Sequence, residues 1–249
     1  MPRTDVLLKY VTRGYEDQEV HFEVPVSVYP SDSGVVIINS PGASEVKDGR
    51  NNRWDTLAQH LQNQRVGTVV TYNPPLPDAR SKHPDEPYSY RGASWNKLVV
   101  ESLIHVVDYA LENAKSICGS STPILYLSGF SAGGSACGAV AHLYPEVQRI
   151  LLISAYDSVG DYFYDGIERF TGEVYMTYGV QDVMAGFLAY SMRFIAPRIS
   201  LLRTQEIPDC DHGFTGATNS KILGNAFTWA FAGDKNFPAP DGGLTLYGD

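Results

Sequence analysis

Two kinds of hydrophobic pattern occur in the first third of the chain. Residues 20–30, VHFEVPVSVYP, place an apolar side chain at every second position, which is typical of a strand with one face toward water. Residues 6–12 predict a strand before it. Residues 34–40 and 66–75 are continuous apolar runs rich in β-branched side chains, as expected of strands buried on both faces. The N-terminal region therefore predicts two early strands followed by interior strands of a sheet.

Segments with helical spacing separate these apolar runs. Trp54, Leu57 and Leu61 fall on one face of a helix expected over residues 53–64. Further strands are expected at residues 123–129, 147–155, 173–179 and 199–207, and helices directly after residue 131 and at residues 95–117, 183–197 and 218–232. This alternation predicts a mostly parallel sheet with helices on both faces. Right-handed crossovers then bring the functional loops to the carboxyl ends of the strands.

Length and organisation indicate one domain. The chain has 249 residues, and no repeat, low-complexity segment or linker divides it. We expect a single α/β domain over residues 1–249, with an irregular Pro/Gly-rich tail from about residue 234 onward.

Charge and cysteine content limit the partners and the compartment. With 19 basic and 28 acidic residues the formal net charge is −9, which argues against a nucleic acid or an anionic membrane as the main partner. No apolar run approaches the ~20 residues that span a bilayer, and Lys9 and Arg13 interrupt the apolar stretch near the start. The three cysteines fit neither a disulfide framework nor a zinc site, and one pairing among them stays open. These features predict a cytoplasmic protein.

One serine stands in an unusual glycine-rich turn, GFSAGG. Ser131 lies between Gly129 and Gly133, where an apolar strand gives way to a helix. A strand that turns sharply into a helix brings the flanking backbone into contact, so a Cβ at either flank would clash. Such a turn lifts the hydroxyl off the sheet and directs the free N–H groups of the helix toward whatever the hydroxyl attacks. The alternative is a helix start whose small residues serve packing alone.

In this strand–turn–helix setting, GFSAGG resembles the nucleophile elbow, G-x-S-x-G, of the α/β-hydrolase superfamily. The resemblance extends from about residue 20 to about residue 232 and implies an α/β-hydrolase fold. Residues 156–172 are too few to form the independent lid domain that some members insert there. The resemblance further implies that Ser131 is the nucleophile, and that an acid and a histidine follow it in that order after later strands.

Asp182 and His212 occupy the positions that resemble those of the acid and the histidine. Asp182 follows the strand ending at Gly179, and His212 follows the last strand. An imidazole can take the proton from serine, and a carboxylate can hold the imidazole in the correct tautomer. Other interpretations stay open: Asp157 is the main rival for the acid, Asp182 alternatively caps the following helix, and His212 alternatively bonds only to backbone.

The same resemblance implies an oxyanion hole with two N–H donors. Ala132, directly after the nucleophile, is expected to supply one from the start of its helix. The second is expected from the loop after residue 40, where the family often has a His-Gly pair and this chain has Pro41-Gly42. Ala43 is the candidate donor, with Gly42 beside it against the substrate. A plain polar loop is the alternative.

Aromatic residues near these loops are candidates for a substrate wall. Tyr90, Trp95 and Tyr156 are expected to contact substrate, and core packing is the alternative for each. The cluster formed by Tyr156, Tyr162, Phe163 and Tyr164 is expected to roof a pocket. Such a site would be shallow and open, which suits an acyl or aryl ester of modest size.

The sequence therefore predicts a serine hydrolase that works through an acyl-enzyme and needs no metal or organic cofactor. The expected substrate is a small-molecule carboxylic ester. The alternatives are a thioester, a peptide or amide, or a non-catalytic binding module of the same fold. A haloalkane dehalogenase would need aspartate at the elbow and a dienelactone-type hydrolase cysteine, so Ser131 disfavours both.

Overall fold

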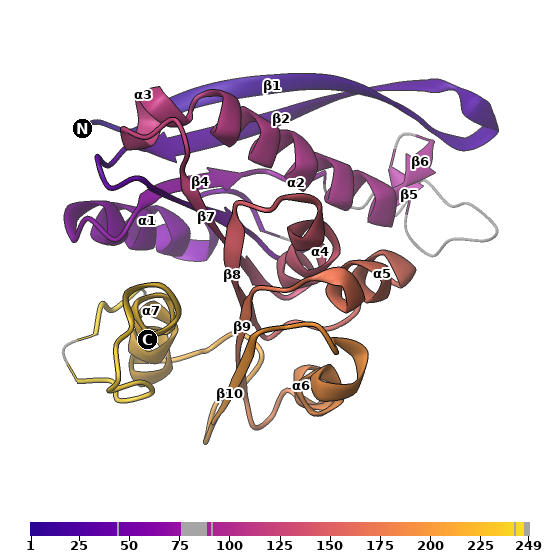
Figure 1. Cartoon of the computed structure of the whole chain (residues 1–249). Helices are drawn as coiled ribbons and strands as arrows, with labels where there is room; N and C mark the ends of the chain where they lie inside the picture. The colour runs from indigo at the N-terminus through magenta and orange to yellow at the C-terminus, as the bar shows by residue number, and fades with distance from the viewer. Residues whose placement is uncertain (44, 76–88, 91, 242, 247–249) are drawn as a thin grey trace.

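The computed structural model describes residues 1–43, 45–75, 89–90, 92–241 and 243–246 (Figure 1). In these residues an eight-stranded sheet has the order β1-β2-β4-β3-β7-β8-β9-β10. Strand β2 is antiparallel to both of its neighbours, and from β4 to β10 all neighbours are parallel. The strands are β1 (Thr4–Arg13), β2 (Glu19–Tyr29), β3 (Val35–Ser40), β4 (Thr68–Tyr72), β7 (Ile124–Phe130), β8 (Val147–Ile153), β9 (Glu173–Gly179) and β10 (Leu201–Ile207), and β5 (Ser89–Tyr90) pairs with β6 (Ala93–Ser94) apart from this sheet.

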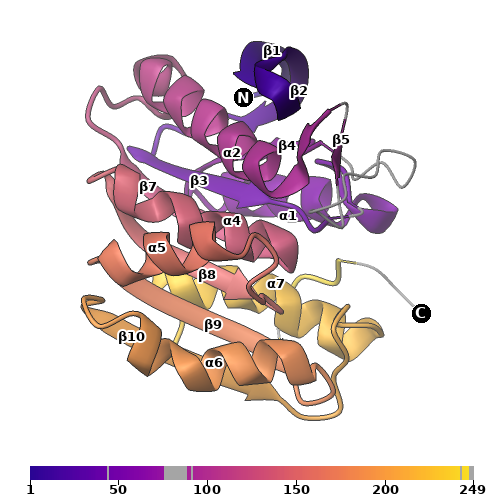
Figure 2. The same cartoon turned by 90° about the vertical axis from the view of Figure 1, so that its right-hand side faces the viewer.

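Helices cover both faces of the sheet (Figures 1 and 2). On one face, α1 (Arg53–Asn63) and α7 (Ala217–Ala232) enclose a core that contains Trp54 and Phe227. The helices over the other face are α2 (Trp95–Glu112), α4 (Ala132–Val140), α5 (Asp161–Arg169) and α6 (Val183–Ile195), and α3 (Ala114–Cys118) follows α2. Short 3-10 turns occur at Tyr15–Asp17, Arg50–Asn52 and Ala141–Leu143. The three layers confirm the expected α/β class with a mostly parallel sheet.

The alternating apolar pattern of β2 reflects burial of every second side chain, as the sequence predicted. Val20, Phe22, Val24, Val26 and Val28 all bury their side chains in the core on the α2 side of the sheet. Because side chains alternate across a strand, the residues between them form the opposite face. The continuous apolar run of β3 is also buried as expected, since the strand lies between β4 and β7.

Two helices differ from the expectation. The helix expected over residues 95–117 ends at Glu112, and α3 begins after Asn113. The Asn113 side chain donates a hydrogen bond to the carbonyl of Tyr109, one helical turn back, and such a side-chain bond competes with helix continuation. Helix α5 was not expected, because only one narrow side of it, with Phe163 and Ile167, is apolar and buried.

The C-terminal tail packs on α7 without forming a helix or strand in its described residues, 233–241 and 243–246. Leu246 is buried, and its N–H donates to the Ser220 hydroxyl over 2.8 Å. The rings of Phe237 and Trp229 stack with centroids 4.6 Å apart. The irregular tail that the sequence predicts is therefore fixed to the domain by specific contacts.

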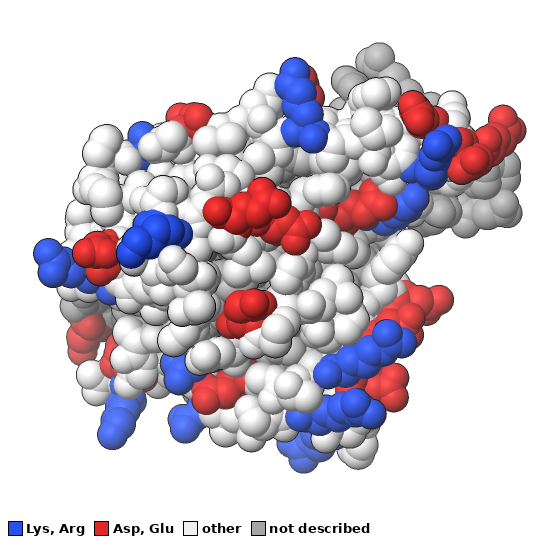
Figure 3. All heavy atoms as spheres, turned by 45° about the horizontal axis from the view of Figure 1, so that its top comes forward, with Lys and Arg blue, Asp and Glu red and all other residues white. Residues whose placement is uncertain are grey.

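The face formed by β1 and α2 carries charged side chains of both signs (Figure 3). Lys9 of β1 pairs with Glu23 of the neighbouring β2, and Lys97 pairs with Glu101 within α2. Basic and acidic groups are interspersed on this face. None of the helices in the described ranges combines the length and the apolar character that a membrane crossing needs.

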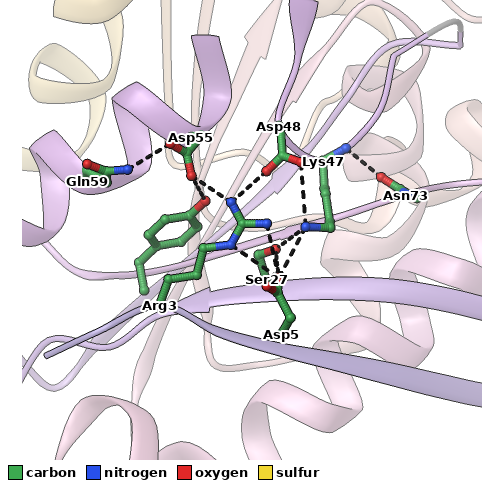
Figure 4. A network of polar contacts seen from close by, with 9 residues as sticks. Arg3, Asp5, Ser27, Lys47, Asp48, Asp55, Gln59 and Asn73 are labelled. Carbon is green, nitrogen blue, oxygen red and sulfur yellow. Dashed lines mark hydrogen bonds and ion pairs between the residues drawn. The ribbon is translucent and has the colours of Figure 1, made fainter. Parts of the chain in front are cut away.

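A polar network holds the start of the chain to the loop after β3 (Figure 4). The Arg3 guanidinium lies 2.8 Å from Asp48 and 2.7 Å from Asp55. Lys47, in the same loop as Asp48, reaches the Asp5 carboxylate of β1 over 3.1 Å. The backbone N–H of Lys47 donates to the Asn73 side chain after β4. The loop that leaves β3 is thus fastened to β1, β4 and α1.

This network predicts an acid-sensitive contribution to stability. The Ser27 hydroxyl, with Lys47 and Arg3, lowers the pKa of Asp5 to about 2 against a raising effect of burial. Because the folded-state pKa lies below the unfolded value of 3.8, the stabilisation is present above about pH 4 and is lost as pH falls through about 2. Asp5 is 61% exposed, so solvent screening limits the effect to under about 1 kcal/mol. We expect Asp5→Asn to lower the free energy of urea unfolding by that amount at pH 6.

The difference in unfolding free energy between the wild type and Asp5→Asn should become smaller as the pH falls from 4 to 2. Urea titrations at several pH values measure it, and Asp17→Asn, whose carboxylate is 84% exposed, is the matched control. A gap that is unchanged at pH 2.5 would contradict the proposed contribution of Asp5.

Candidate active site

The turn after β7 holds Ser131 in a strained backbone conformation. Ser131 has φ 54° and ψ −120°, which non-glycine residues rarely adopt and which costs about 1–3 kcal/mol. Its N–H donates to the carbonyl of Ile153 at the end of β8 over 2.8 Å, and its carbonyl accepts from Gly134. The neighbouring strand and α4 therefore fix the turn from both sides.

The glycines of this turn are required by close backbone approach. A Cβ on Gly129 would collide with the backbone of Gly133. A Cβ on Gly133 would collide with the carbonyl of Ser40 and lie 2.5 Å from that of Pro41. The sequence-based reason for the flanking glycines is therefore correct. In addition, α4 packs directly against the loop that leaves β3.

Three residues far apart in the sequence form one hydrogen-bonded chain at the carboxyl ends of the strands. His212 Nε2 lies 3.1 Å from Ser131 Oγ, and His212 Nδ1 lies 2.6 Å from Asp182 Oδ2. Ser131 follows β7, Asp182 follows β9, and His212 follows β10. The sheet brings together the three residues that the sequence singled out.

Asp182 performs two structural tasks with its two oxygens. While Oδ2 meets His212, Oδ1 accepts the N–H of Ala185 and caps the start of α6. The helix cap that the sequence left open is therefore present, and the same side chain makes the histidine contact that the role of acid requires; that role stays a prediction. The rival carboxylate, Asp157, instead accepts a hydrogen bond from Tyr164 over 2.6 Å.

The surroundings of Asp182 favour its ionised form. Burial, with 7% exposure, would by itself raise the pKa of this carboxyl. The hydrogen bond and charge of His212 and the N–H of Ala185 outweigh burial and lower the pKa below its usual range. A carboxylate held ionised at neutral pH can orient His212 and stabilise its protonated form. The His212 side chain is 44% exposed, so a bound molecule can reach it.

The two expected oxyanion donors lie in the expected loops. Ala132 is the first residue of α4, where an N–H has no acceptor within the helix. Ala43 lies in a turn closed by the N–H of Glu45 and the carbonyl of Gly42. A Cβ on Gly42 would lie 3.5 Å from the Cβ of Ser131, so this loop reaches the Ser131 turn. The donor roles of Ala132 and Ala43 stay predictions.

The aromatic candidates separate into different environments. The Tyr156 ring lies 6.4 Å from the His212 ring, at the site. Trp95 does not line it: this side chain is 4% exposed, belongs to the core under α2, and donates its indole N–H to the Pro75 carbonyl. The prediction of a substrate contact for Trp95 is therefore wrong. The backbone of Tyr90 lies in β5, and its side chain is outside the described part of the chain.

The aromatic cluster expected to form a roof is likewise split. Phe163 is fully buried and occupies the space over Gly138 of α4. Tyr162 and Tyr164 are exposed on α5. Helical geometry, which sends neighbouring side chains in different directions, explains the division.

Sequence reasoning missed a buried ion pair that joins three loops of the site. Arg53, at the start of α1, lies 2.6 Å from Glu45 in the loop after β3, and both are largely buried. Its guanidinium carbon lies 4.4 Å from the centre of the Phe130 ring, next to Ser131. It also donates to the carbonyl of Gly213, next to His212. The helical pattern indicated Arg53 only as the first residue of a helix, and no local signal shows its distant partners.

The ion pair predicts that Arg53→Met lowers both stability and activity. Removing one partner leaves the Glu45 charge buried without compensation, which costs about 3–5 kcal/mol. We expect that loss in urea unfolding, and a fall of about 10- to 100-fold in kcat on a short aryl ester because the three loops lose their common anchor. Adding Glu45→Gln, which keeps an acceptor for the Trp54 indole, should recover part of the stability.

The matched control is Arg50→Met, since Arg50 is exposed three residues earlier. It should change the unfolding free energy by less than about 0.5 kcal/mol. Equal losses from the two arginine variants would contradict the anchoring role of Arg53.

Comparison with known proteins gives structural likeness alone. No family model and no curated protein sequence matches the chain. Among solved structures, a dienelactone hydrolase from Anabaena variabilis has a TM-score of 0.65 at 15% identity, covering 92% of this chain and 99% of that one. A carboxyl esterase 2 from the mycorrhizal fungus Tuber melanosporum has a TM-score of 0.59 at 14% identity, covering 91% and 88%. An alpha-beta serine hydrolase homologue from Coxiella burnetii has a TM-score of 0.53 at 17% identity, covering 83% and 89%.

These neighbours share the sheet and its helices across most of both chains. At sequence identities of 14 to 17%, the similarity supports a shared fold but not a shared activity. The chain has the α/β-hydrolase fold.

Proposed function

We propose that this protein is a serine hydrolase that cleaves small carboxylic esters through an acyl-enzyme. The observation that carries the proposal is the continuous hydrogen-bonded chain from Ser131 through His212 to the Asp182 carboxylate. A hydroxyl becomes a useful nucleophile only when a positioned base can take its proton. The neighbours described as esterases and serine hydrolases support this chemistry for the fold.

The first half of the proposed reaction acylates Ser131. Its oxygen attacks the ester carbonyl carbon while His212 Nε2 takes the hydroxyl proton, and Asp182 stabilises the imidazolium. The carbonyl oxygen becomes an oxyanion, which the N–H groups of Ala132 and Ala43 bind, each contributing about 3 kcal/mol. Collapse of this intermediate breaks the ester C–O bond. His212 then gives its proton to the departing alcohol oxygen.

The second half regenerates the enzyme. A water molecule gives a proton to His212 and attacks the acyl carbon, again forming an oxyanion at the same donors. The Ser131 oxygen leaves, recovers the proton from His212, and the carboxylic acid is released. The cycle consumes one water and needs no metal or organic cofactor.

The surroundings of the site support an ester of modest size. Tyr156 lies beside His212 and supplies an apolar surface with a polar end. Between β8 and β9 the chain forms only α5, a helix of 9 residues, in place of a lid domain. A short acyl or aryl ester can enter such a site from solvent.

Labelling with a fluorophosphonate tests the proposal directly. We expect one adduct, located on Ser131 by peptide mass spectrometry, and much slower labelling of His212→Ala because the base is gone. Rates of cleavage are then compared for a phenyl ester, a phenyl thioester and an anilide with the same acyl group. We expect the ester to be cleaved fastest. A folded protein that acquires no adduct and cleaves none of the three would refute the hydrolase and favour a binding module.

A further inference from the structure

The outer side of α6, with the turn before it, exposes large apolar side chains. Six large apolar side chains there are between 49% and 77% exposed, and together they form what we call the α6 face: Val180, Val183, Met184, Phe187, Tyr190 and Phe194. The inner side of the same helix is buried through Leu188 and Met192. A surface helix of a monomer carries polar residues toward water, so an apolar outer side needs another explanation.

The size of the α6 face matches one side of a protein interface. With roughly 150–250 Å² for each aromatic side chain and less for valine and methionine, the exposed parts add up to about 700 Å². The largest apolar patch on a typical monomer covers only about 300–600 Å². A standard interface buries about 800 Å² on each partner. The α6 face therefore offers most of the area that one partner in a stable complex buries.

The spacing within the α6 face indicates that the partner is a helix. Val183, Phe187, Tyr190 and Phe194 follow one another at intervals of four, three and four residues. This is the spacing with which one helix presents a seam to another. The rings of Tyr190 and Phe194 lie 6.2 Å apart and give the seam a broad aromatic end.

The partner that fits is a second copy of this chain. A two-fold axis places the same patch on both subunits, so a seam of uncharged side chains meets itself without like charges in contact. Helix α6 lies on the outside of the molecule beside the edge strand β10, where a second copy can approach (Figure 2). The net charge of −9 argues against an anionic membrane as the occupant.

We propose that the α6 faces of two copies pack antiparallel across a two-fold axis and form a homodimer. The axis passes near the middle of the seam, between Phe187 and Tyr190. This homodimer is independent of the proposed hydrolase function. Its test uses association, not activity.

Sedimentation velocity across the micromolar range tests the dimer. The wild type should sediment at twice the chain mass of 27.4 kDa. Phe187→Glu with Phe194→Glu should weaken association at least 100-fold, since four carboxylates would meet at the seam. The control, Leu7→Glu with Val11→Glu on β1, changes two apolar side chains that are about half exposed, and it should stay dimeric. Circular dichroism and thermal melting establish that each variant is folded.

Cross-linking locates the axis. A short bismaleimide should join two Tyr190→Cys chains and leave two Val11→Cys chains separate. The native cysteines do not interfere, because all three are buried: Cys118, Cys137 and Cys210. A monomeric wild type would overturn the proposal, and so would a dimer that the glutamate pair leaves intact. Flotation of monomeric wild type with phosphatidylcholine vesicles would assign the α6 face to a lipid surface instead and overturn the dimer.

Discussion

Ser131→Ala is expected to lower kcat on a short aryl ester by at least about 10⁴-fold while the protein stays folded. Without Oγ there is no nucleophile for His212 to activate, and what remains comes from binding and the oxyanion donors. Alanine at φ 54° is no more strained than serine, so the melting temperature should change little. Steady-state kinetics with a chromogenic ester measures the rate, and differential scanning calorimetry measures the stability.

A neighbouring serine provides the control for this variant. Ser128 lies in β7, three residues before Ser131, and its buried hydroxyl donates to the Asn39 side chain over 3.0 Å. Ser128→Ala should lower the free energy of unfolding by about 1 kcal/mol and leave kcat within a few-fold of the wild type. If Ser131→Ala keeps more than a tenth of the rate while folded, the proposed nucleophile is wrong.

Asp182→Asn is expected to lower kcat by about 10⁴-fold with little loss of stability. An amide in place of the carboxylate donates to His212 Nδ1 and so leaves the proton on Nε2, which then cannot accept the proton of Ser131. Asparagine is as good a helix cap as aspartate, so α6 keeps its start. Rate and melting temperature, measured on the same sample, separate the two tasks of this residue.

Two further variants sharpen the interpretation of Asp182. Asp182→Ala should lose the rate and also about 1 kcal/mol of stability, because it removes the cap as well. Asp157→Asn, which changes the rival carboxylate bonded to Tyr164, should leave kcat nearly unchanged. A large loss in Asp157→Asn together with a small loss in Asp182→Asn would reverse the assignment of the acid.

Local patterns predicted the sheet and the three site loops because both depend on short-range features. Alternation in β2 and apolar runs such as β3 are imposed by the face that each strand buries, so period alone reveals them. The turn at Ser131 requires small flanks for steric reasons that any sequence must obey. The resemblance to the α/β-hydrolase superfamily, and not these patterns, pointed to Asp182 and His212, which lie near Ser131 because their strands end at one edge of the sheet.

Features that depend on distant contacts were not predictable in this way. Trp95 reads like a surface aromatic near a loop, and only the packing of α2 against the sheet shows that it is core. Arg53 reads like a polar helix start, although Glu45 and the Gly213 carbonyl, far away along the chain, determine its position. The periodicity of α6 is apolar on both sides, and sequence alone cannot distinguish which side the sheet covers.

The two contacts of Asp182 link the local stability of α6 to the position of His212. One of its oxygens caps the first turn of α6 and the other bonds to the His212 imidazole. Loss of the helical turn would therefore also disturb the imidazole. In the proposed reaction His212 is the base, so fraying of that turn would release the imidazole and lower the activity before the domain unfolds. Heat inactivation of the proposed enzyme would then begin at a single helical turn, before the sheet itself comes apart.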